Sequence, residues 1–340
     1  MIKVAAFTGG KTVPSARFRV RQYIAPLANL GIEINELPCR FQKYPPEHIL
    51  ARPVWLGALL AEQAVNLMKT RSYDVVLLQR EIVSKLITYE RWLGENVLLD
   101  VDDAFFLFRG GHIGEYIAKR ASVVVCGNGY LADNFSKWNP RVHVIPTAVD
   151  TEAYRPRDQS RDDHKPTIGW IGTSSNLHEL MAVEGALGKA LEAFPKAKLR
   201  VVCDVFPKFT YLKSRQLEYI EWSEAKEICA IQGMDIGIMP LQDSAWARGK
   251  CAFKMLQYMA CGLPSVVSPV GMNQEVLGTG KFSLAARTEN EWADALVWLL
   301  GDRDARHSMG VQAREVAESK FSLRVLAPHV AAAIREVSCA

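Results

Sequence analysis

Two lysines and a glutamine interrupt an otherwise apolar segment, RGKCAFKMLQYMACGLPSVVSPVG, at residues 248–271. A Gly-Leu-Pro turn inside this segment predicts the end of a helix that covers residues 251–261. Lys250, Lys254 and Gln257 recur at i, i+4 and i+7, which places them on one face as a polar seam. Ammonium groups at a helix start oppose its dipole, and a bound anion would offset that cost. The spacing therefore predicts a diphosphate site with Gln257 on the ribose hydroxyls; the alternative is two solvated lysines whose stems cover apolar surface.

A turn rich in small residues could contribute to the same phosphate site. The segment GWIGTSSNLHEL, residues 169–180, predicts a strand, a turn and a helix start. We expect the backbone N–H groups and hydroxyls of this turn to be open to phosphate oxygens. The residues concerned are Gly172, Thr173 and Ser174. Asn176 and Glu179 have the spacing of a capping box for the helix that follows.

A second turn, in SPVGMNQEV at residues 268–276, also follows a predicted strand and opens a helix. Gly271 lets the backbone come close to a ligand, and Asn273 could supply an amide. Glu275 has the position of a first-turn acid, which stabilises a helix start. We therefore expect Gly271 and Asn273 to contact the same ligand as the lysines.

Three carboxylates, Asp100, Asp102 and Asp103, end a predicted strand in LLDVDDAFF. Open α/β sheets bind ligands at the carboxyl ends of their strands. The acids could form a metal site, which the Asp100-Val-Asp102 spacing suggests, or a helix cap with solvated neighbours. They could also accept hydrogen bonds from sugar hydroxyls. We favour this last interpretation and expect no metal, because Lys250 and Lys254 already supply positive charge for a leaving diphosphate.

Basic residues also follow the first predicted strand, where a helix that begins near Ala16 would place Arg17 and Arg21 on one face. A guanidinium there could hold phosphate in a bidentate manner, although ordinary solvated arginines fit equally well. The basic and hydroxyl residues of this stretch are Lys11, Ser15, Arg17, Arg19 and Arg21. His112, in a glycine-rich bend after the acids, is either structural or a catalytic group that reaches the ligand.

The elements that would position these residues form two series of short apolar strands that alternate with amphipathic helices. The predicted strands are 2–8, 74–79, 96–101, 122–127 and 142–147 in the first half and 167–172, 199–204, 235–240 and 264–269 in the second. Most are continuous apolar runs, as in parallel strands that are covered on both faces. The alternation predicts an α/β protein with two Rossmann-like parallel-sheet domains. The predicted divisions are a domain at 1–155, a polar linker at 156–166, a second domain at 167–318 and a C-terminal helical piece at 319–340.

Composition agrees with two ordinary globular domains: 340 residues, 49% hydrophobic and 23% charged. The seven scattered cysteines form no CxxC pair or Cys/His cluster, which favours reduced thiols over a disulfide framework or zinc site. No segment predicts a signal peptide or a membrane span. Residues 1–150 hold 18 Lys or Arg against 14 Asp or Glu, and residues 151–340 hold 23 of each. The basic first half would suit an anionic acceptor or membrane surface; no motif points to nucleic acid.

The segments GKCAFKMLQYMACGLPSVVSPVGMNQEV and VHVIPTAVDTEAYRP resemble retaining glycosyltransferases of the GT-B fold, and more narrowly bacterial members of glycosyltransferase family four. PSARFRVRQYIAPLANLGIEI, LLDVDDAFF and GNGYLADNF are similar to one branch of that family. The resemblance implies two domains that face a cleft, with the nucleotide sugar on the C-terminal domain and a C-terminal helix that packs on the N-terminal one. The family has two glutamates eight positions apart, on the donor sugar and the ribose; Gly249 and Gln257 occupy those positions here.

The expected reaction is transfer of a hexosyl-type group from a nucleotide diphosphate sugar to an acceptor hydroxyl. The resemblance implies retention of configuration, by front-face displacement assisted by the leaving phosphate. Lys250 and Lys254 would stabilise that phosphate, while Asp102 and Asp103 would hold the acceptor. We expect no cofactor and no metal, a carbohydrate, lipid-linked or protein acceptor in polysaccharide biosynthesis, and a cytoplasmic enzyme, peripheral at the inner membrane face if the basic half binds there. The alternatives are a nucleotide-sugar epimerase, a hinged binding protein and a nicotinamide dehydrogenase, the last lacking a GxGxxG motif.

Overall fold

The computed structural model describes residues 1–10, 13–41, 43, 45–46, 48–157, 165–212 and 214–339. The chain forms two compact units. Unit 1 consists of Met1–Ala148, Arg248–Cys251 and Leu323–Ala340, and unit 2 of Val149–Ala247 and Ala252–Ser322. The first unit thus ends at Ala148 rather than at the predicted residue 155. Most of the predicted linker, residues 158–164, lies outside the described residues.

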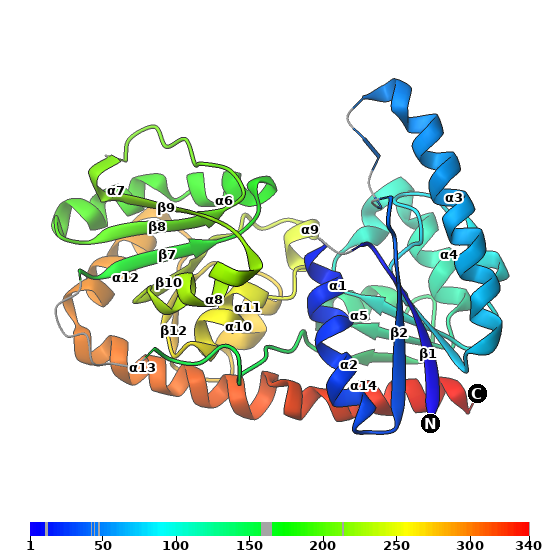
Figure 1. The fold of residues 1–340 in the computed structure, drawn as a ribbon. Helices are drawn as coiled ribbons and strands as arrows, with labels where there is room; N and C mark the ends of the chain where they lie inside the picture. The colour runs from blue at the N-terminus through cyan, green and yellow to red at the C-terminus, as the bar shows by residue number, and fades with distance from the viewer. Residues whose placement is uncertain are drawn as a thin grey trace. The chain divides into compact units, whose positions relative to one another are not determined.

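Unit 1 is built on a six-stranded parallel sheet with the order β2-β1-β3-β4-β5-β6 (Figure 1). Its strands are β1 (Ile2–Thr8), β2 (Ile32–Pro38), β3 (Val75–Gln79), β4 (Val97–Val101), β5 (Val123–Cys126) and β6 (Val142–Val144). Its helices are α1 (Pro14–Arg19), α2 (Ile24–Ala28), α3 (Arg52–Lys69), α4 (His112–Arg120), α5 (Gly129–Phe135) and α14 (Leu323–Ser338).

The central strands of unit 1 are apolar except near their carboxyl ends, because helices cover both faces of the sheet. Along β3, Val76 and Leu78 pack on the side of α3, α4 and α5, while Val75 and Leu77 pack on the side of α2 and α14. Successive side chains of a strand point to opposite faces, so a strand covered twice buries the residues on both of its faces. This is why the continuous apolar runs predicted the central strands correctly.

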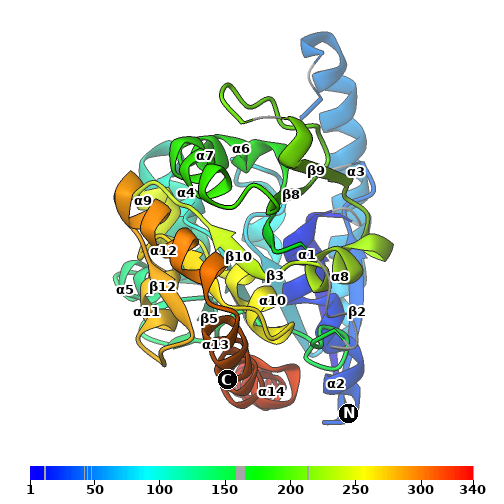
Figure 2. The ribbon, with the colours of Figure 1, turned by 90° about the vertical axis from the view of Figure 1, so that its left-hand side faces the viewer.

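Unit 2 contains a second six-stranded parallel sheet, with the order β12-β11-β10-β7-β8-β9 (Figures 1 and 2). Its strands are β7 (Thr167–Ile171), β8 (Lys198–Cys203), β9 (Leu217–Glu221), β10 (Ile236–Met239), β11 (Ser265–Val267) and β12 (Ser283–Ala285). Its helices are α6 (Leu177–Met181), α7 (Glu184–Ala193), α8 (Glu224–Gln232), α9 (Ala245–Arg248), α10 (Phe253–Ala260), α11 (Met272–Leu277), α12 (Glu289–Gly301) and α13 (Arg303–Val316). Ile236 and Ile238 of β10 face α7 and α12, and Met239 faces α8 and α10.

The predicted fold class, two Rossmann-like parallel sheets in an α/β chain, is confirmed. The sequence missed β2, β9 and β12, and each of these strands is at an edge of its sheet. Edge strands are only partly buried, as β9 shows, so their sequences lack a continuous apolar run. After α13, a single wider helical turn, Ala317–Phe321, precedes α14, which contributes Leu326, Ala331 and Ile334 to the core of unit 1. No helix in the described ranges has the length and apolarity needed to cross a membrane.

Candidate active site

The turn after β7 brings Gly172, Thr173 and Ser174 to the carboxyl end of a central strand of unit 2. Its polar groups are not open, contrary to the prediction. The Ser174 N–H and Oγ donate to the two carboxylate oxygens of Asp204, at 2.6 and 2.8 Å. The Gly172 N–H donates to the Val202 carbonyl at 3.0 Å, and the Thr173 hydroxyl bonds the Ser175 hydroxyl. Asp204 therefore occupies the two Ser174 donors that the sequence assigned to phosphate.

The predicted capping box is also wrong. Asn176 makes no side-chain cap for α6 and instead donates to Thr173 Oγ1 at 2.9 Å. Glu179 is 5% exposed and accepts a hydrogen bond from the Gln242 N–H at 2.7 Å. The glutamate thus ties α6 to the loop after β10, because a buried carboxylate needs donors and that loop supplies one.

Lys254 lies at the carboxyl end of β7, beside the turn that contains Gly172. It is half-buried in the first turn of α10, and its Nζ lies 4.7 Å from the centre of the Trp170 ring. A Cβ on Gly172 would lie 2.9 Å from the same Nζ. The glycine therefore leaves the space through which the ammonium group reaches the end of the strand. A cation–π contact of this kind contributes about 0.5–2 kcal/mol to holding the ammonium group at that position.

Lys250 does not belong to the helix of Lys254, so the predicted polar seam is wrong. The helix begins at Phe253, and Lys250 belongs to the segment Arg248–Cys251 that packs within unit 1. Asn128 holds that segment by donating from Nδ2 to the carbonyls of Arg248 and Lys250, at 3.2 and 3.1 Å. Of the two lysines, Lys254 belongs to unit 2 and Lys250 to unit 1.

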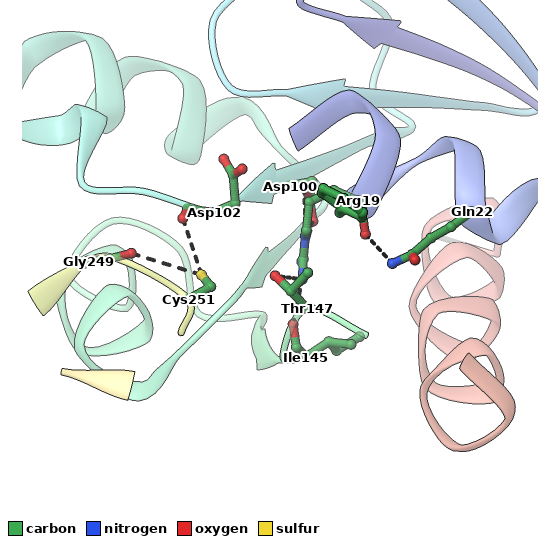
Figure 3. A network of polar contacts seen from close by, with 9 residues as sticks. Arg19, Gln22, Asp100, Asp102, Ile145, Thr147, Gly249 and Cys251 are labelled. Carbon is green, nitrogen blue, oxygen red and sulfur yellow. Dashed lines mark hydrogen bonds and ion pairs between the residues drawn. The ribbon is translucent and has the colours of Figure 1, made fainter. Parts of the chain in front are cut away.

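Gly249 shows why this segment carries no glutamate where the resembled family has one. An added Cβ at Gly249 would lie 2.8 Å from the backbone N of Ala104 and 2.7 Å from its Cβ. Backbone cannot yield in the way that a flexible side chain can, so a longer residue would displace the segment. The Cys251 thiol completes the packing by donating to the Asp102 carbonyl at 3.1 Å (Figure 3). Close packing therefore accounts for the glycine.

Gln257 faces the core rather than a ligand. Gln257 is 3% exposed. Its Nε2 donates to the Tyr154 hydroxyl at 3.0 Å and to Glu227 Oε1 at 3.2 Å. Tyr154 donates to the same Glu227 oxygen, and the Trp222 indole N–H donates to the other at 2.8 Å. Three neutral donors thus satisfy one buried carboxylate. The predicted contact between Gln257 and a ribose is therefore wrong.

We expect Gln257→Leu to lower the free energy of unfolding by about 1–3 kcal/mol, because it removes a donor from a buried carboxylate. Urea denaturation measures the loss. Gln274→Leu is the matched control, since Gln274 is exposed on α11 and its replacement should leave stability unchanged within about 0.5 kcal/mol. Equal stabilities of the two variants would contradict the role of Gln257 in this network.

The loop between β11 and α11 contains the other two predicted contacts. Gly271 has φ +53°, a left-handed conformation that favours glycine, and it opens α11. Asn273 is 1% exposed, and its Nδ2 donates to the Ser268 carbonyl at 3.0 Å. Its Oδ1 is buried without a hydrogen-bond partner. The side chain of Asn273 therefore braces the loop, and backbone groups near Gly271 are what the loop can present to a ligand.

A cavity of about 500 Å³ opens beside this loop in unit 2. It lies at the carboxyl ends of β10 and β11, the edge at which parallel sheets bind ligands. Its lining includes Glu179, Asp243, Ser268, Arg287 and Glu289. Acceptor oxygens outnumber cations in it, so the cavity suits hydroxyl groups better than phosphates.

The first acid of the cluster in unit 1, Asp100, belongs to a buried ion pair (Figure 3). Arg19 Nε lies 3.1 Å from both carboxylate oxygens, and Nη2 lies 2.5 Å from Oδ1. Arg19 Nη1 donates to the Ile145 carbonyl at 2.9 Å and to Thr147. The pair joins α1, β4 and the segment after β6. Asp100 is therefore a structural acid, neither a metal ligand nor a contact for a sugar hydroxyl.

Asp102 and Asp103 each keep a buried oxygen, Oδ1, without a hydrogen-bond partner. Asp103 binds Arg80 through its other oxygen, at 2.5 Å. Burial raises the pKa of Asp103 to about 7, against the opposing effect of Arg80. Buried polar atoms in native proteins almost always have partners, and a ligand hydroxyl would supply one for each of these oxygens. Across the residues described, no three His, Cys, Asp or Glu side chains gather as a metal site would require.

The groups that support Asp103 escaped the sequence analysis. Arg80 lies directly after β3 with φ +61° and contacts Glu81, which is 1% exposed. Lys43, itself 4% exposed, reaches Glu81 at 3.7 Å. The sequence Arg-Glu after a strand does not reveal this arrangement, because the arrangement depends on a left-handed residue and on a lysine from a distant loop. The local hint is that two charged residues, Arg80 and Glu81, directly follow a buried apolar strand.

The other predicted cations have structural partners or remain at the surface. Arg21 binds Glu36 at 2.8 Å and the Gly10 carbonyl at 2.7 Å, and Arg17 stacks on the Phe18 ring. Lys11 lies outside the described residues. His112 begins α4 and is exposed. Arg19, the arginine between Arg17 and Arg21, is the buried one, because its helix turns that face toward β4.

Comparison with known proteins gives this site a chemical context. The family described as "Glycosyl transferases group 1" matches residues 165–302. D-inositol 3-phosphate glycosyltransferase of Corynebacterium urealyticum is 22% identical over 214 residues, which are 55% of this chain and 49% of that protein. The chain therefore spans about half the length of the curated relative that it matches.

Solved structures resemble the whole chain. Sucrose-phosphate synthase of Thermosynechococcus elongatus has a TM-score of 0.76 at 14% identity, with 100% of each chain covered. Anabaena HepE in complex with UDP and glucose has a TM-score of 0.70 at 13% identity, covering 98% of this chain and 99% of HepE. At such identities the likeness shows the fold. The chain has the GT-B fold, and its residues 165–302 match the family of group 1 glycosyl transferases.

Proposed function

We propose that this chain is a glycosyltransferase that moves a hexosyl-type group from a nucleotide diphosphate sugar to an acceptor hydroxyl, with retention of configuration and without a metal. The match of residues 165–302 to group 1 glycosyltransferases supports the reaction class. The HepE structure, solved with UDP and glucose, supports a nucleotide sugar as donor. Membership in glycosyltransferase family four is part of the proposal. An epimerase on the same fold is disfavoured, because the matched family and the curated relative are both described as glycosyltransferases.

The observation that carries the proposal is the position of the Lys254 ammonium group. It lies over Trp170 and beside Gly172, at the carboxyl end of a central strand, in the domain that matches the family. A cation at that edge of the sheet attracts an anionic ligand, and the two phosphates of a donor are anionic at neutral pH. The backbone near Gly271 and the hydroxyl-accepting cavity beside it would receive the sugar and ribose.

In the proposed reaction, the bond between the anomeric carbon and the diphosphate oxygen breaks, and the diphosphate leaves with the electron pair. The acceptor oxygen forms the new bond on the same face of the sugar, and its proton passes to the leaving phosphate. Lys254 stabilises the negative charge that develops on that phosphate. A fixed cation meets this requirement, so a metal would add little to it.

The acceptor would bind through the carboxylates of unit 1. Asp102 Oδ1 and Asp103 Oδ1 are buried acceptors without partners, which suits the hydroxyl groups of a sugar on a carbohydrate, lipid-linked or protein acceptor. Arg80, Glu81 and Lys43 hold the orientation of Asp103. Because the sequence carries no acid in the position of a nucleophile, retention follows from front-face displacement in this proposal.

The pKa of Asp103 predicts a pH dependence for acceptor use. With this pKa at about 7, the carboxylate is protonated below that pH, and kcat/KM for the acceptor should rise as pH increases through 7. Asp103→Asn should abolish the rise and, like Asp102→Asn, should weaken acceptor use more than donor binding. Initial rates at varied acceptor concentration measure the first effect, and donor calorimetry the second.

The same pKa shift affects stability with a definite sign. The folded state holds the Asp103 proton up to about pH 7, and the unfolded chain releases it near pH ~4. This group therefore stabilises the fold most below pH ~4, and its contribution falls as pH rises to 7.

A kcat/KM profile that is flat across pH 7 in the unaltered enzyme would contradict the assignment of Asp103.

A further inference from the structure

An apolar stripe runs along the exposed side of α3 in unit 1. Val54 is 77% exposed, Val65 47% and Met68 62%. Ala58 and Ala61 lie between them at helical spacing, so one face of the helix is apolar over its whole length. The described part of the chain places no apolar cover over these three large side chains, and an exposed stripe of this length marks a surface that binds something.

This stripe is a second apolar face and not a core face turned outward. The core-facing side of α3 has its own apolar residues: Leu59 is fully buried, and Trp55, Leu56, Leu60 and Leu67 pack against the same core. Gln63 and Asn66 are buried beside them and bond each other through Asn66 Nδ2 and Gln63 Oε1 at 3.4 Å. A helix that serves only the fold has one apolar face, directed inward. In α3 a second set of apolar side chains remains in water.

The start of α3 extends the stripe into a projecting tip. Ile49 and Leu50, just before the helix, are 71% and 93% exposed, and Phe41 on the approaching chain is 51% exposed. In both views the first turns of α3 stand beyond the end of β2 (Figures 1 and 2). Leu50 is the most exposed of the large apolar residues that the structure describes.

A cavity of about 600 Å³ lies between this stripe and the edge strand β2. Leu37, Pro38 and Phe41 line it from the strand side, and Ala58 and Val65 line it from the helix. Its wall is therefore mainly apolar along its length. A space of this size and character fits hydrocarbon better than it fits a polar ligand.

The charges around the stripe identify what would cover it. Residues 40–71 contain five Lys or Arg and two Glu; of the five, Lys43 is buried against Glu81, and Arg40 lies 3.9 Å from Glu62. The Arg40 side chain is 83% exposed, and Arg52 and Lys69 are exposed at the two ends of the helix. Cations that flank an apolar helical face match the interface of an anionic bilayer, where acyl chains meet acidic headgroups. A second copy of the chain would instead bring like charges together.

We propose that unit 1 docks on an anionic lipid bilayer through the α3 surface, which comprises Ile49, Leu50, Val54, Val65 and Met68 with Arg40, Arg52 and Lys69. The tip enters the boundary between headgroups and acyl chains, and the arginines and lysine contact acidic headgroups. Docking of this kind needs neither donor nor acceptor, so it stands apart from the proposed transfer reaction.

Vesicle flotation of the full chain tests this docking. We expect binding to vesicles of equal parts phosphatidylcholine and phosphatidylglycerol, weaker binding to phosphatidylcholine alone, and loss at high ionic strength. Leu50→Asp and Val65→Asp should each weaken binding to the anionic vesicles about tenfold. Val311→Asp on α13 of unit 2 is the matched control, because Val311 is 47% exposed, as is Val65. It should bind as the unaltered chain does.

Binding that is equal for Leu50→Asp, Val65→Asp and Val311→Asp would overturn the assignment, as would failure of the unaltered chain to float with any vesicle. Sedimentation supplies an independent arm. A dimer that Leu50→Asp dissociates would show that a second copy covers the stripe, which also overturns the proposal. Leu50 and Val65 are exposed, so unfolding measurements should confirm that both variants fold normally.

Discussion

Lys254→Ala is expected to weaken nucleotide diphosphate binding by about 1.5–3 kcal/mol, or roughly tenfold to 150-fold in Kd. The ammonium group over Trp170 is the one predicted cation that unit 2 holds at the carboxyl end of β7. Its loss removes a charged hydrogen bond to the diphosphate without opening the core, because Lys254 is only half-buried. Titration calorimetry with nucleoside diphosphates measures the change, and circular dichroism shows whether the variant is folded.

The control for this experiment is Lys196→Ala. Lys196 is an exposed lysine just before β8, at the amino end of a strand and hence away from the ligand edge of the sheet. Its replacement should leave Kd unchanged. The same Kd for both variants, with Lys254→Ala folded, would remove Lys254 from the donor site and take away the main structural support for the proposed function.

Arg19→Leu is expected to lower the free energy of unfolding by about 3–5 kcal/mol, the largest stability effect that the structure predicts. The change leaves the Asp100 carboxylate buried without its partner and removes the donor to the Ile145 carbonyl. A charge confined to a protein interior needs a counter-charge or several donors, and neither remains. Urea denaturation at neutral pH, followed by a probe in unit 1, measures the loss.

Two further variants separate the buried pair from a general effect of losing an arginine. The double variant Arg19→Leu with Asp100→Leu should recover much of the stability, since no unpaired charge is left. Arg21→Leu should cost about 1 kcal/mol or less, because Arg21 pairs with Glu36 at the surface, with 26% of its side chain exposed. Comparable losses for Arg19→Leu and Arg21→Leu would mean that burial of the ion pair contributes little.

The sequence predicted the interior of each sheet better than its edges. Runs such as 74–79 and 235–240 are apolar because both faces of their strands are covered, and this pattern is local. Edge strands such as β9 face the core on few positions and carry charged residues, so periodicity does not separate them from loops. The two-sheet fold could therefore be predicted, while its outer strands could not.

Residues of the candidate site that depend on local helix pattern could be predicted, and those that depend on distant partners could not. Lys254 stands in a helix whose apolar pattern fixes its face, and in the structure it lies over Trp170 at the carboxyl end of β7. The role of Lys250 depended on extending that helix by one turn, but Ala252 has φ +52° and the chain leaves the helical path there. Gln257 and Ser174 have partners in Glu227 and Asp204, acids distant in sequence. Hydrogen bonds between distant segments are not visible in local spacing.

A donor-binding screen in EDTA tests the central claim most directly. The purified chain is titrated with UDP-, GDP-, ADP- and dTDP-sugars by calorimetry, with a chelator present throughout. We expect one nucleotide class to bind, Lys254→Ala to lose about tenfold or more of that affinity, and Lys196→Ala to retain it. Failure of every nucleotide sugar to bind, or binding that appears only after Mg²⁺ or Mn²⁺ is added, would contradict the account.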